Sequence, residues 1–167
     1  MFYKDALKTQ IRFLGKKHKD TMNTMTGLGV LYTVTDRLDR AESLILEAYK
    51  NASKECKGNE RTLLICMNNA ASFLGKKNEP KRSAEIYSDC LRLAQEMYGE
   101  NHPETARQMN NLGVQLERLG EFRKAEILYK KAITIVASLQ SPDSPSLRIY
   151  SSNLAQLSGR ERCSNPI

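Results

Sequence analysis

The sequence predicts an all-α fold: a right-handed α-solenoid of stacked antiparallel helix hairpins, with about eight helices. Three observations predict it. A landmark of small and polar residues returns every 42 residues, beginning at Gly27, Asn69, Asn111 and Asn153. An Ala-Glu pair follows each of the first three landmarks. Around these landmarks, apolar residues recur at the spacing of one helical face.

Each predicted repeat consists of a first helix, A, and a second helix, B. We expect one array over residues 1–158, divided into 2–14 (orphan helix B), 18–57, 59–99 and 101–140 (three full repeats), 142–158 (orphan helix A) and a polar tail, 159–167. The array thus begins and ends inside a repeat. Repeat arrays usually need polar caps at their ends. We therefore expect a fragment of a longer protein, or a neighbouring protein that covers the ends.

The third repeat shows the boundary signals most clearly. Asn101 or a neighbour is expected to cap helix A, and Pro103 stands near the first helical position, where its missing N–H costs nothing. Gly120 ends that helix, and helix B follows from about Phe122. The last helix A is expected to end soon after Leu157, at a Ser-Gly pair.

A small residue in each helix A predicts close packing against helix B. In the first repeat Met25, Leu28, Gly29 and Tyr32 form one helical stripe. The small residue in this stripe lets the partner helix approach, and an alanine on helix B supplies the complementary site. The small A-helix positions are Gly29, Ala71 and Gly113, and the alanines are Ala41, Ala84 and Ala125.

Composition narrows the class of function. The net charge is +7, but basic residues are interleaved with acidic ones along the whole chain, so a solvated basic surface is favoured over a nucleic-acid site. No stretch has the roughly 18 apolar residues that a membrane span needs. Cys56, Cys66, Cys90 and Cys163 form no close pair or metal-like cluster, which predicts thiols in a reducing compartment, with no metal or cofactor.

Residues 2–14 are basic and amphipathic, as a mitochondrial presequence is. Asp5 is unlike such peptides, which are poor in acidic residues, and Leu7 and Ile11 have the helical spacing of a packed helix. The segment is therefore expected to be a helix B of the array. We expect a cytoplasmic location, with a mitochondrial one as the alternative.

The third repeat carries a pattern that is specific for one family. It contains Gly99, His102-Pro103, Asn110-Asn111-Leu112, Gly120, Ala125-Glu126 and Ala132. This pattern closely resembles the 42-residue tetratricopeptide repeat of kinesin light chains, over about residues 2–158. The resemblance implies a tetratricopeptide-repeat (TPR) α-solenoid that binds other proteins.

The first repeat departs from that family, with Thr26-Gly27 in place of Asn-Asn and a turn without glycine. The heptad coiled coil of kinesin light chains is absent, so binding to a motor heavy chain is not implied. The spacing from Cys66 through His102-Pro103 to Asn153 also resembles a mitochondrial tetratricopeptide family that supports assembly of a respiratory complex.

In this architecture the A helices line a concave face, and their outward stripe is the candidate peptide-binding site. Its expected residues are Asn23, Asn68, Asn69, Ser72, Lys76, Arg107, Asn110, Asn111, Val114, Arg118 and Asn153. Val30 and Val34 make the first repeat apolar, whereas later repeats add basic groups that attract carboxylates. These features predict an extended peptide with acidic residues beside one or two bulky apolar ones. The resemblance agrees, because kinesin light chains accept acidic peptides with an aromatic residue.

Asparagine is unfavourable inside a helix, so its recurrence needs a reason. The carboxamide can hydrogen-bond the main chain of a bound peptide. It can also bond to the neighbouring repeat and align the stack. Both interpretations stay open for Asn69, Asn111 and Asn153, while Asn68 and Asn110 favour ligand contact.

Three other classes of function compete with peptide binding. His18 and His102 occupy equivalent inter-repeat turns, which indicates a structural role rather than general-base catalysis, and phosphate-loop and metal motifs are absent. No enzymatic activity or small-molecule substrate is therefore expected. RNA-binding helical arrays have a different period. The main alternative is an architectural subunit or assembly factor in a larger complex, for example a mitochondrial respiratory, motor or ciliary one.

Overall fold

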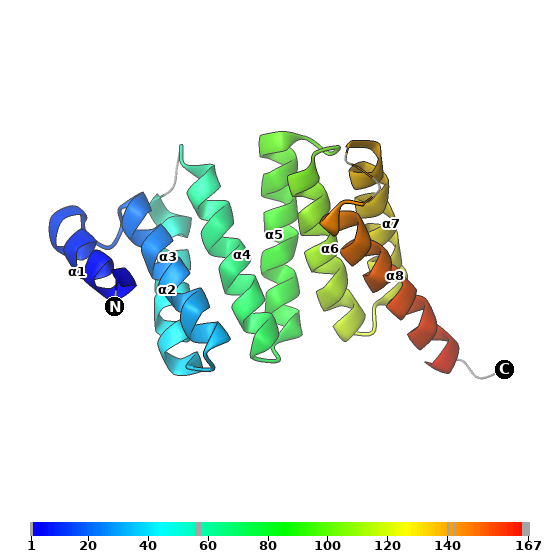
Figure 1. Ribbon diagram of the computed structural model, residues 1–167, viewed down its shortest axis with the longest axis horizontal. Coiled ribbons are helices and arrows are strands. Elements are labelled where there is room, and N and C mark those ends of the chain that lie inside the picture. Colours follow the sequence, from blue (N-terminus) through cyan, green and yellow to red (C-terminus); the bar gives the residue numbers. More distant parts are fainter. Residues whose placement is uncertain (1, 56–57, 140, 142, 165–167) are drawn as a thin grey trace. The chain divides into compact units, whose positions relative to one another are not determined.

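The computed structural model describes residues 2–55, 58–139, 141 and 143–164 (Figure 1). Within these residues every regular element is an α-helix. The helices are α1 (Phe2–Leu14), α2 (Lys19–Val34), α3 (Leu38–Glu55), α4 (Glu60–Lys76), α5 (Pro80–Tyr98), α6 (Pro103–Arg118), α7 (Phe122–Leu139) and α8 (Pro145–Ser164). The predicted all-α class is confirmed.

The helices form two compact units, Met1–Glu79 with α1 to α4 and Pro80–Ile167 with α5 to α8. In unit 1, α2 packs against α1, α3 and α4; in unit 2, α6 packs against α5, α7 and α8. The sequence predicted one array without this division, whose boundary falls inside the predicted second repeat. A repeat period identifies equivalent helices, but it carries no information about where packing is densest.

The two A–B hairpins that lie within one unit, α2–α3 and α6–α7, use the same turn with different residues. Gly120 has φ +79° after α6, and the N–H of Glu121 donates to the Leu116 carbonyl (2.9 Å). After α2 this left-handed position is taken by Asp36 (φ 57°), which tolerates it better than most residues. The first repeat can therefore turn without a glycine.

Small residues set the distance between helices A and B in both units. A Cβ atom on Gly113 would lie 2.7 Å from Cε1 of the buried Tyr129 on α7, and a Cβ atom on Gly29 would collide with Ile45 of α3. Ala41 on α3 and Ala125 on α7 are fully buried. The packing therefore needs the small residues that the sequence pattern contains.

The two histidines start the A helices of their hairpins. Nδ1 of His18 accepts from the Asp20 N–H (3.3 Å), and Nδ1 of His102 accepts from the Glu104 N–H (3.1 Å). The ring of His102 also stacks on Tyr98, with centroids 4.7 Å apart. The side chain that caps α6 is thus the neighbour of the expected Asn101, and both histidines serve as helix caps.

The last helix differs from its prediction. Residues 159–167 were expected to form a polar tail, but α8 continues to Ser164, while 165–167 lie outside the described residues. The Ser158 hydroxyl donates back to the Leu154 carbonyl (3.1 Å), and Arg160 pairs with Glu117 of α6 (3.2 Å). These contacts support the helix across Gly159, whose helical cost is about 1 kcal/mol relative to alanine.

The thiols Cys66 and Cys90 are buried in unit 1 and unit 2. Cys56 and the side chain of Cys163 lie outside the described part of the chain. In the described ranges, no helix is long and apolar enough to cross a membrane.

Candidate functional site

The candidate peptide site consists of outward faces of A helices, one in each unit. The unit 1 face is formed by α2 and α4, which pack side by side. Its residues are Asn23, Val30 and Val34 from α2, and Ile65, Asn69, Ser72 and Lys76 from α4. The unit 2 face is formed by α6 and α8, with Arg107, Asn111, Val114, Arg118, Ile149, Ser152, Asn153 and Gln156.

The unit 1 face combines aliphatic and polar groups. Val34 is 75% exposed, while Val30 and Ile65 are 39% and 38% exposed. Asn23, Ser72 and Lys76 are also exposed. Exposed valine and isoleucine beside hydroxyl and amide groups can bind both the side chains and the main chain of a peptide.

The two asparagines of α4 have different surroundings. Asn69 is half-buried, and its Nδ2 donates to the Ile65 carbonyl (2.8 Å). Asn68 is only 8% exposed, and its Nδ2 donates to the Leu64 carbonyl (2.9 Å). On sequence alone, Asn68 is favoured for ligand contact over Asn69. The structure instead buries Asn68 and places Asn69 nearer the surface, because successive residues of a helix are rotated by about 100°.

The buried amide of Asn68 is incompletely satisfied. Its Oδ1 is buried and has no hydrogen-bond partner among the described residues. A buried acceptor without a partner costs about 1–3 kcal/mol. That oxygen therefore lowers the stability of the folded chain.

Lys76 connects the two helices of the unit 1 face. Its Nζ donates to the Thr33 carbonyl in the last turn of α2. Carbonyl groups at a helix C-terminus carry partial negative charge and attract a cation. The lysine is thus held at the edge of the face, beside the exposed Val34, and its charge stays accessible to a ligand carboxylate.

On the unit 2 face, two asparagines bond to each other. Nδ2 of Asn153 on α8 donates to Oδ1 of Asn110 on α6 (2.8 Å), and Asn110 is only 6% exposed. This bond joins two neighbouring A helices, so it supports the interpretation that Asn153 aligns the stack. Asn111 and Val114, by contrast, are half-buried at the surface of α6.

The arginines of the unit 2 face already have partners on their own helix. Arg107 forms a two-point ion pair with Glu104, through Nε at 3.2 Å and through a second guanidinium nitrogen. Arg118 contacts Gln115 Oε1 at 3.5 Å. An exposed ion pair contributes about 0–1 kcal/mol, so a ligand carboxylate could exchange with Glu104 at low cost.

Two buried side chains of unit 2, Cys90 and Tyr129, have raised pKa values. Burial raises the pKa of the Cys90 thiol to about 12, which keeps it protonated and a poor nucleophile. Burial, and then the nearby Glu117 carboxylate, also raise the pKa of Tyr129. In the part of the chain that is described, no group of three His, Cys, Asp or Glu side chains could hold a metal ion.

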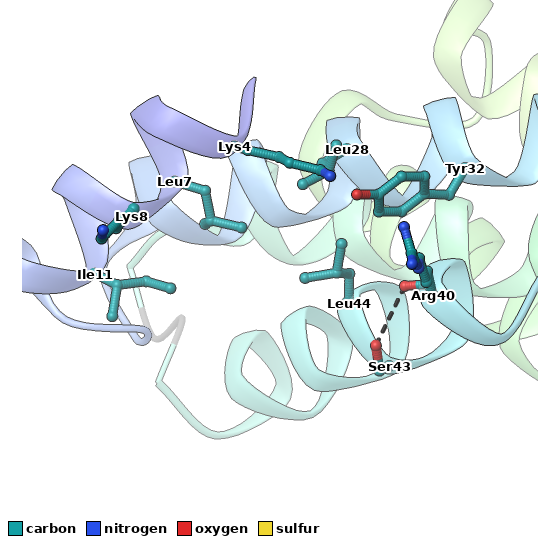
Figure 2. A pocket seen from close by; sticks show the side chains of 9 residues that line it. All are labelled: Lys4, Leu7, Lys8, Ile11, Leu28, Tyr32, Arg40, Ser43 and Leu44. Atoms are coloured by element: carbon teal, nitrogen blue, oxygen red, sulfur yellow. Dashed lines mark hydrogen bonds between the residues drawn. The ribbon is translucent and has the colours of Figure 1, made fainter. Parts of the chain in front are cut away.

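One feature of unit 1 escaped the sequence prediction. A groove of about 590 Å³ lies between α1, α2 and α3 (Figure 2). The signal for it was present in residues 2–14, where Lys4, Leu7, Lys8 and Ile11 share one helical face. On sequence alone, this face is expected only to pack against the rest of the array.

Comparison with known proteins agrees with this architecture. Residues 63–138 match the family model for the tetratricopeptide repeat. A human relative, "Tetratricopeptide repeat protein 19, mitochondrial", is 30% identical over 132 residues, or 78% of this chain. The chain spans 33% of the length of that relative.

Solved structures are similar along most of the chain. BtubC (BKLC) from P. vanneervenii has a TM-score of 0.81 at 23% identity, over 95% of this chain and 63% of its own. Nearly identical TPR-like repeats assigned to a kinesin light chain of Podosopora anserina have a TM-score of 0.79 at 15% identity, over 96% of this chain and 77% of theirs. At these identities the likeness shows the fold alone.

Proposed function

We propose that this chain, which carries tetratricopeptide repeats, is a scaffold that binds an extended peptide segment of a partner protein. The tetratricopeptide fold generally mediates protein–protein interactions. One observation carries the proposal for this chain. Polar side chains recur at equivalent surface positions of α4 and α6: the half-buried Asn69 and Asn111, and the exposed Lys76 and Arg118. On α4 the exposed Ile65 stands beside them. These are interior helix positions where polar side chains contribute nothing to the core.

The proposed ligand has acidic residues next to bulky apolar ones. On the unit 1 face, Val34 and Ile65 offer aliphatic contact and Lys76 offers a cation. On the unit 2 face, Arg107 and Arg118 are exposed. Guanidinium groups bind carboxylates through paired, charge-assisted hydrogen bonds, which supports acidic residues in the ligand.

In this proposal the asparagines divide into two groups. Asn69 and Asn111 are surface residues and contact the peptide, whereas Asn110 and Asn153 hold α6 to α8. The Nδ2 of Asn69 donates to its own helix, so its Oδ1 can accept from an N–H of a bound main chain. Asn23, Ser72 and Val114 complete the proposed contact surface.

A peptide-display selection against the chain, followed by fluorescence polarisation, tests the proposal. Selected peptides should be rich in Asp and Glu and carry a bulky apolar residue. Arg107→Ala/Asn111→Ala should weaken binding about tenfold, because two contact groups are lost. The matched control is Arg123→Ala/Lys131→Ala on α7, where both residues are exposed away from the face. Equal affinity of the two variants would overturn the assignment.

An architectural or assembly role is the second candidate, and a mitochondrial location goes with it. The human relative is named as mitochondrial, which favours that compartment over the cytoplasmic one first expected. Phe2 and Phe13 of α1 are 90% and 73% exposed, an apolar surface that a neighbouring protein could cover. Light scattering of the isolated chain separates the candidates: a monomer supports peptide binding, whereas self-association through α1 supports the architectural role.

A further inference from the structure

The groove in unit 1 has an apolar floor and a basic rim (Figure 2). Its floor is formed by aliphatic and aromatic side chains from three helices, Leu7 and Ile11 of α1, Leu28 and Tyr32 of α2, and Leu44 of α3. Its rim is formed by Lys4, Lys8, Arg40 and Ser43. We call this feature the α1–α3 groove.

The groove arises from the way α1 packs. Helix α1 lies against α2, and α2 lies against α3, but α1 and α3 do not pack closely on each other. Leu7 and Leu28 are nearly buried at the bottom, 7% and 4% exposed. Ile11 and Leu44 are half-buried on opposite walls, so both still have apolar surface to lose to a ligand.

The charges of the groove are of one sign. Its lining contains three cations and no carboxylate. Nζ of Lys4 lies 5.9 Å from the centroid of the Tyr32 ring, and within the described residues neither Lys8 nor Arg40 forms an ion pair. The groove thus has uncompensated positive charge that an acidic ligand would neutralise.

Basic residues just beyond α1 behave differently. Lys16 pairs with Glu47 (2.8 Å) and Lys17 pairs with Glu55 (2.6 Å), both on α3. Carboxylates of α3 therefore neutralise the lysines of the turn, and the groove next to them is left basic. This contrast separates the groove from an ordinary mixed-charge surface.

We propose that the α1–α3 groove binds an acidic amphipathic helix of a partner protein. An aliphatic stripe on that helix would fill the floor between Ile11 and Leu44. Acidic residues on both sides of the stripe would meet Lys8 on one wall and Arg40 on the other. A helix fits better than an extended strand, because the walls are themselves helices and a helix presents successive turns of one stripe to them.

This site is separate from the faces assigned to an extended peptide. The groove uses α1 and α3, whereas the unit 1 face uses α4 and the opposite side of α2. Its volume of about 590 Å³ lies within the range of pockets that bind ligands, and its floor is apolar, as is usual in such pockets. The two sites can therefore be tested independently.

The probe is a helical peptide of Leu, Ala and Glu, with leucines at i, i+4 and i+7 and glutamates on both flanks. Its binding to the chain is measured by fluorescence polarisation, and a second peptide has lysine in place of every glutamate. The acidic peptide should bind saturably, with affinity that falls as salt rises, and the lysine peptide should not bind. The charge reversal Lys8→Glu/Arg40→Glu should weaken binding about tenfold or more, because two attractions become repulsions.

Two controls make the test specific. Lys50→Glu/Arg61→Glu changes the net charge equally at exposed positions outside the groove and should leave affinity unchanged. Asn69→Ala/Lys76→Ala alters the unit 1 face and should also leave it unchanged. Leu44→Gln tests the floor, with circular dichroism to verify folding. The groove proposal is overturned if the acidic peptide does not bind saturably, or if the lysine peptide binds equally well. It is also overturned if the charge control loses as much affinity as the groove variant. None of these outcomes bears on the peptide faces.

Discussion

Two glycines of α2 should respond to alanine in opposite ways. Gly29→Ala should destabilise unit 1, whereas Gly27→Ala, two residues earlier, should stabilise it. Both glycines lie inside the same helix, so alanine gains the same helical propensity at each position, up to about 1 kcal/mol. The difference between the two variants therefore isolates the packing against the partner helix.

The contacts of each glycine determine how much its replacement changes the free energy of unfolding. A Cβ atom on Gly27 would lie 3.4 Å from Cε1 of Tyr3, which is ordinary contact. A Cβ atom on Gly29 would collide with Cγ1 of Ile45 and lie 3.1 Å from its Cδ1. Ile45 is 1% exposed and β-branched, so its side chain has no easy alternative position. Overpacking of this kind costs about 1–3 kcal/mol. Helical propensity returns up to about 1 kcal/mol, so Gly29→Ala should lower the free energy of unfolding by up to about 2 kcal/mol.

Urea denaturation followed by circular dichroism measures both variants. A second change, Ile45→Ala, removes the colliding atoms at the cost of a cavity. Gly29→Ala should then cost less in the Ile45→Ala background than alone, with a coupling energy of about 1 kcal/mol. If Gly29→Ala stabilises the chain as much as Gly27→Ala does, the close approach of α2 and α3 does not depend on the glycine, and the packing argument is wrong.

Three further effects should follow from contacts in unit 2. His102→Ala should lower the free energy of unfolding by about 1–2 kcal/mol in urea denaturation, because α6 loses its cap. Asn153→Ala should cost about 1–3 kcal/mol by leaving the buried Asn110 oxygen without its donor, and Asn110→Leu/Asn153→Ala should recover part of that loss. Burial raises the pKa of Cys90 to about 12 in the folded chain, from about 8.5 unfolded, so the stability this thiol contributes is complete below pH 8.5 and falls as pH rises towards 12. The denaturation midpoint should fall from pH 8 to pH 10.5, and it should fall less for Cys90→Ala than for the unsubstituted chain.

The fold could be predicted because its physical causes repeat. Gly29 and Gly113 stand in the same place in their helices, and each meets a large side chain of helix B. A packing demand that recurs every 42 residues leaves a visible period in the sequence. The end of α8 could not be predicted in this way, because the ion pair between Arg160 and Glu117 joins residues outside the repeated pattern.

The α1–α3 groove shows a different limit. Leu7 and Ile11 have the spacing of a packed helical face, and Leu7 is indeed buried within unit 1. The sequence cannot show how far that face is covered, because coverage depends on the separation between α1 and α3. A stripe of apolar and basic residues therefore predicts an amphipathic helix, while the remaining groove is a property of the packed structure.

Asparagine inside a helix is ambiguous for a chemical reason. The same donor and acceptor that could bind a peptide main chain can bind another asparagine one repeat away. In unit 2 the choice depends on burial: Asn110 is turned into the interior, where an unpaired amide oxygen would be costly, and Asn153 supplies the donor at 2.8 Å. Asn111 follows Asn110 by one residue and lies half-buried at the surface of α6. A peptide ligand can therefore use the asparagines that the stack does not need. Asn111→Ala should weaken peptide binding without lowering the free energy of unfolding, whereas Asn153→Ala should lower the free energy of unfolding.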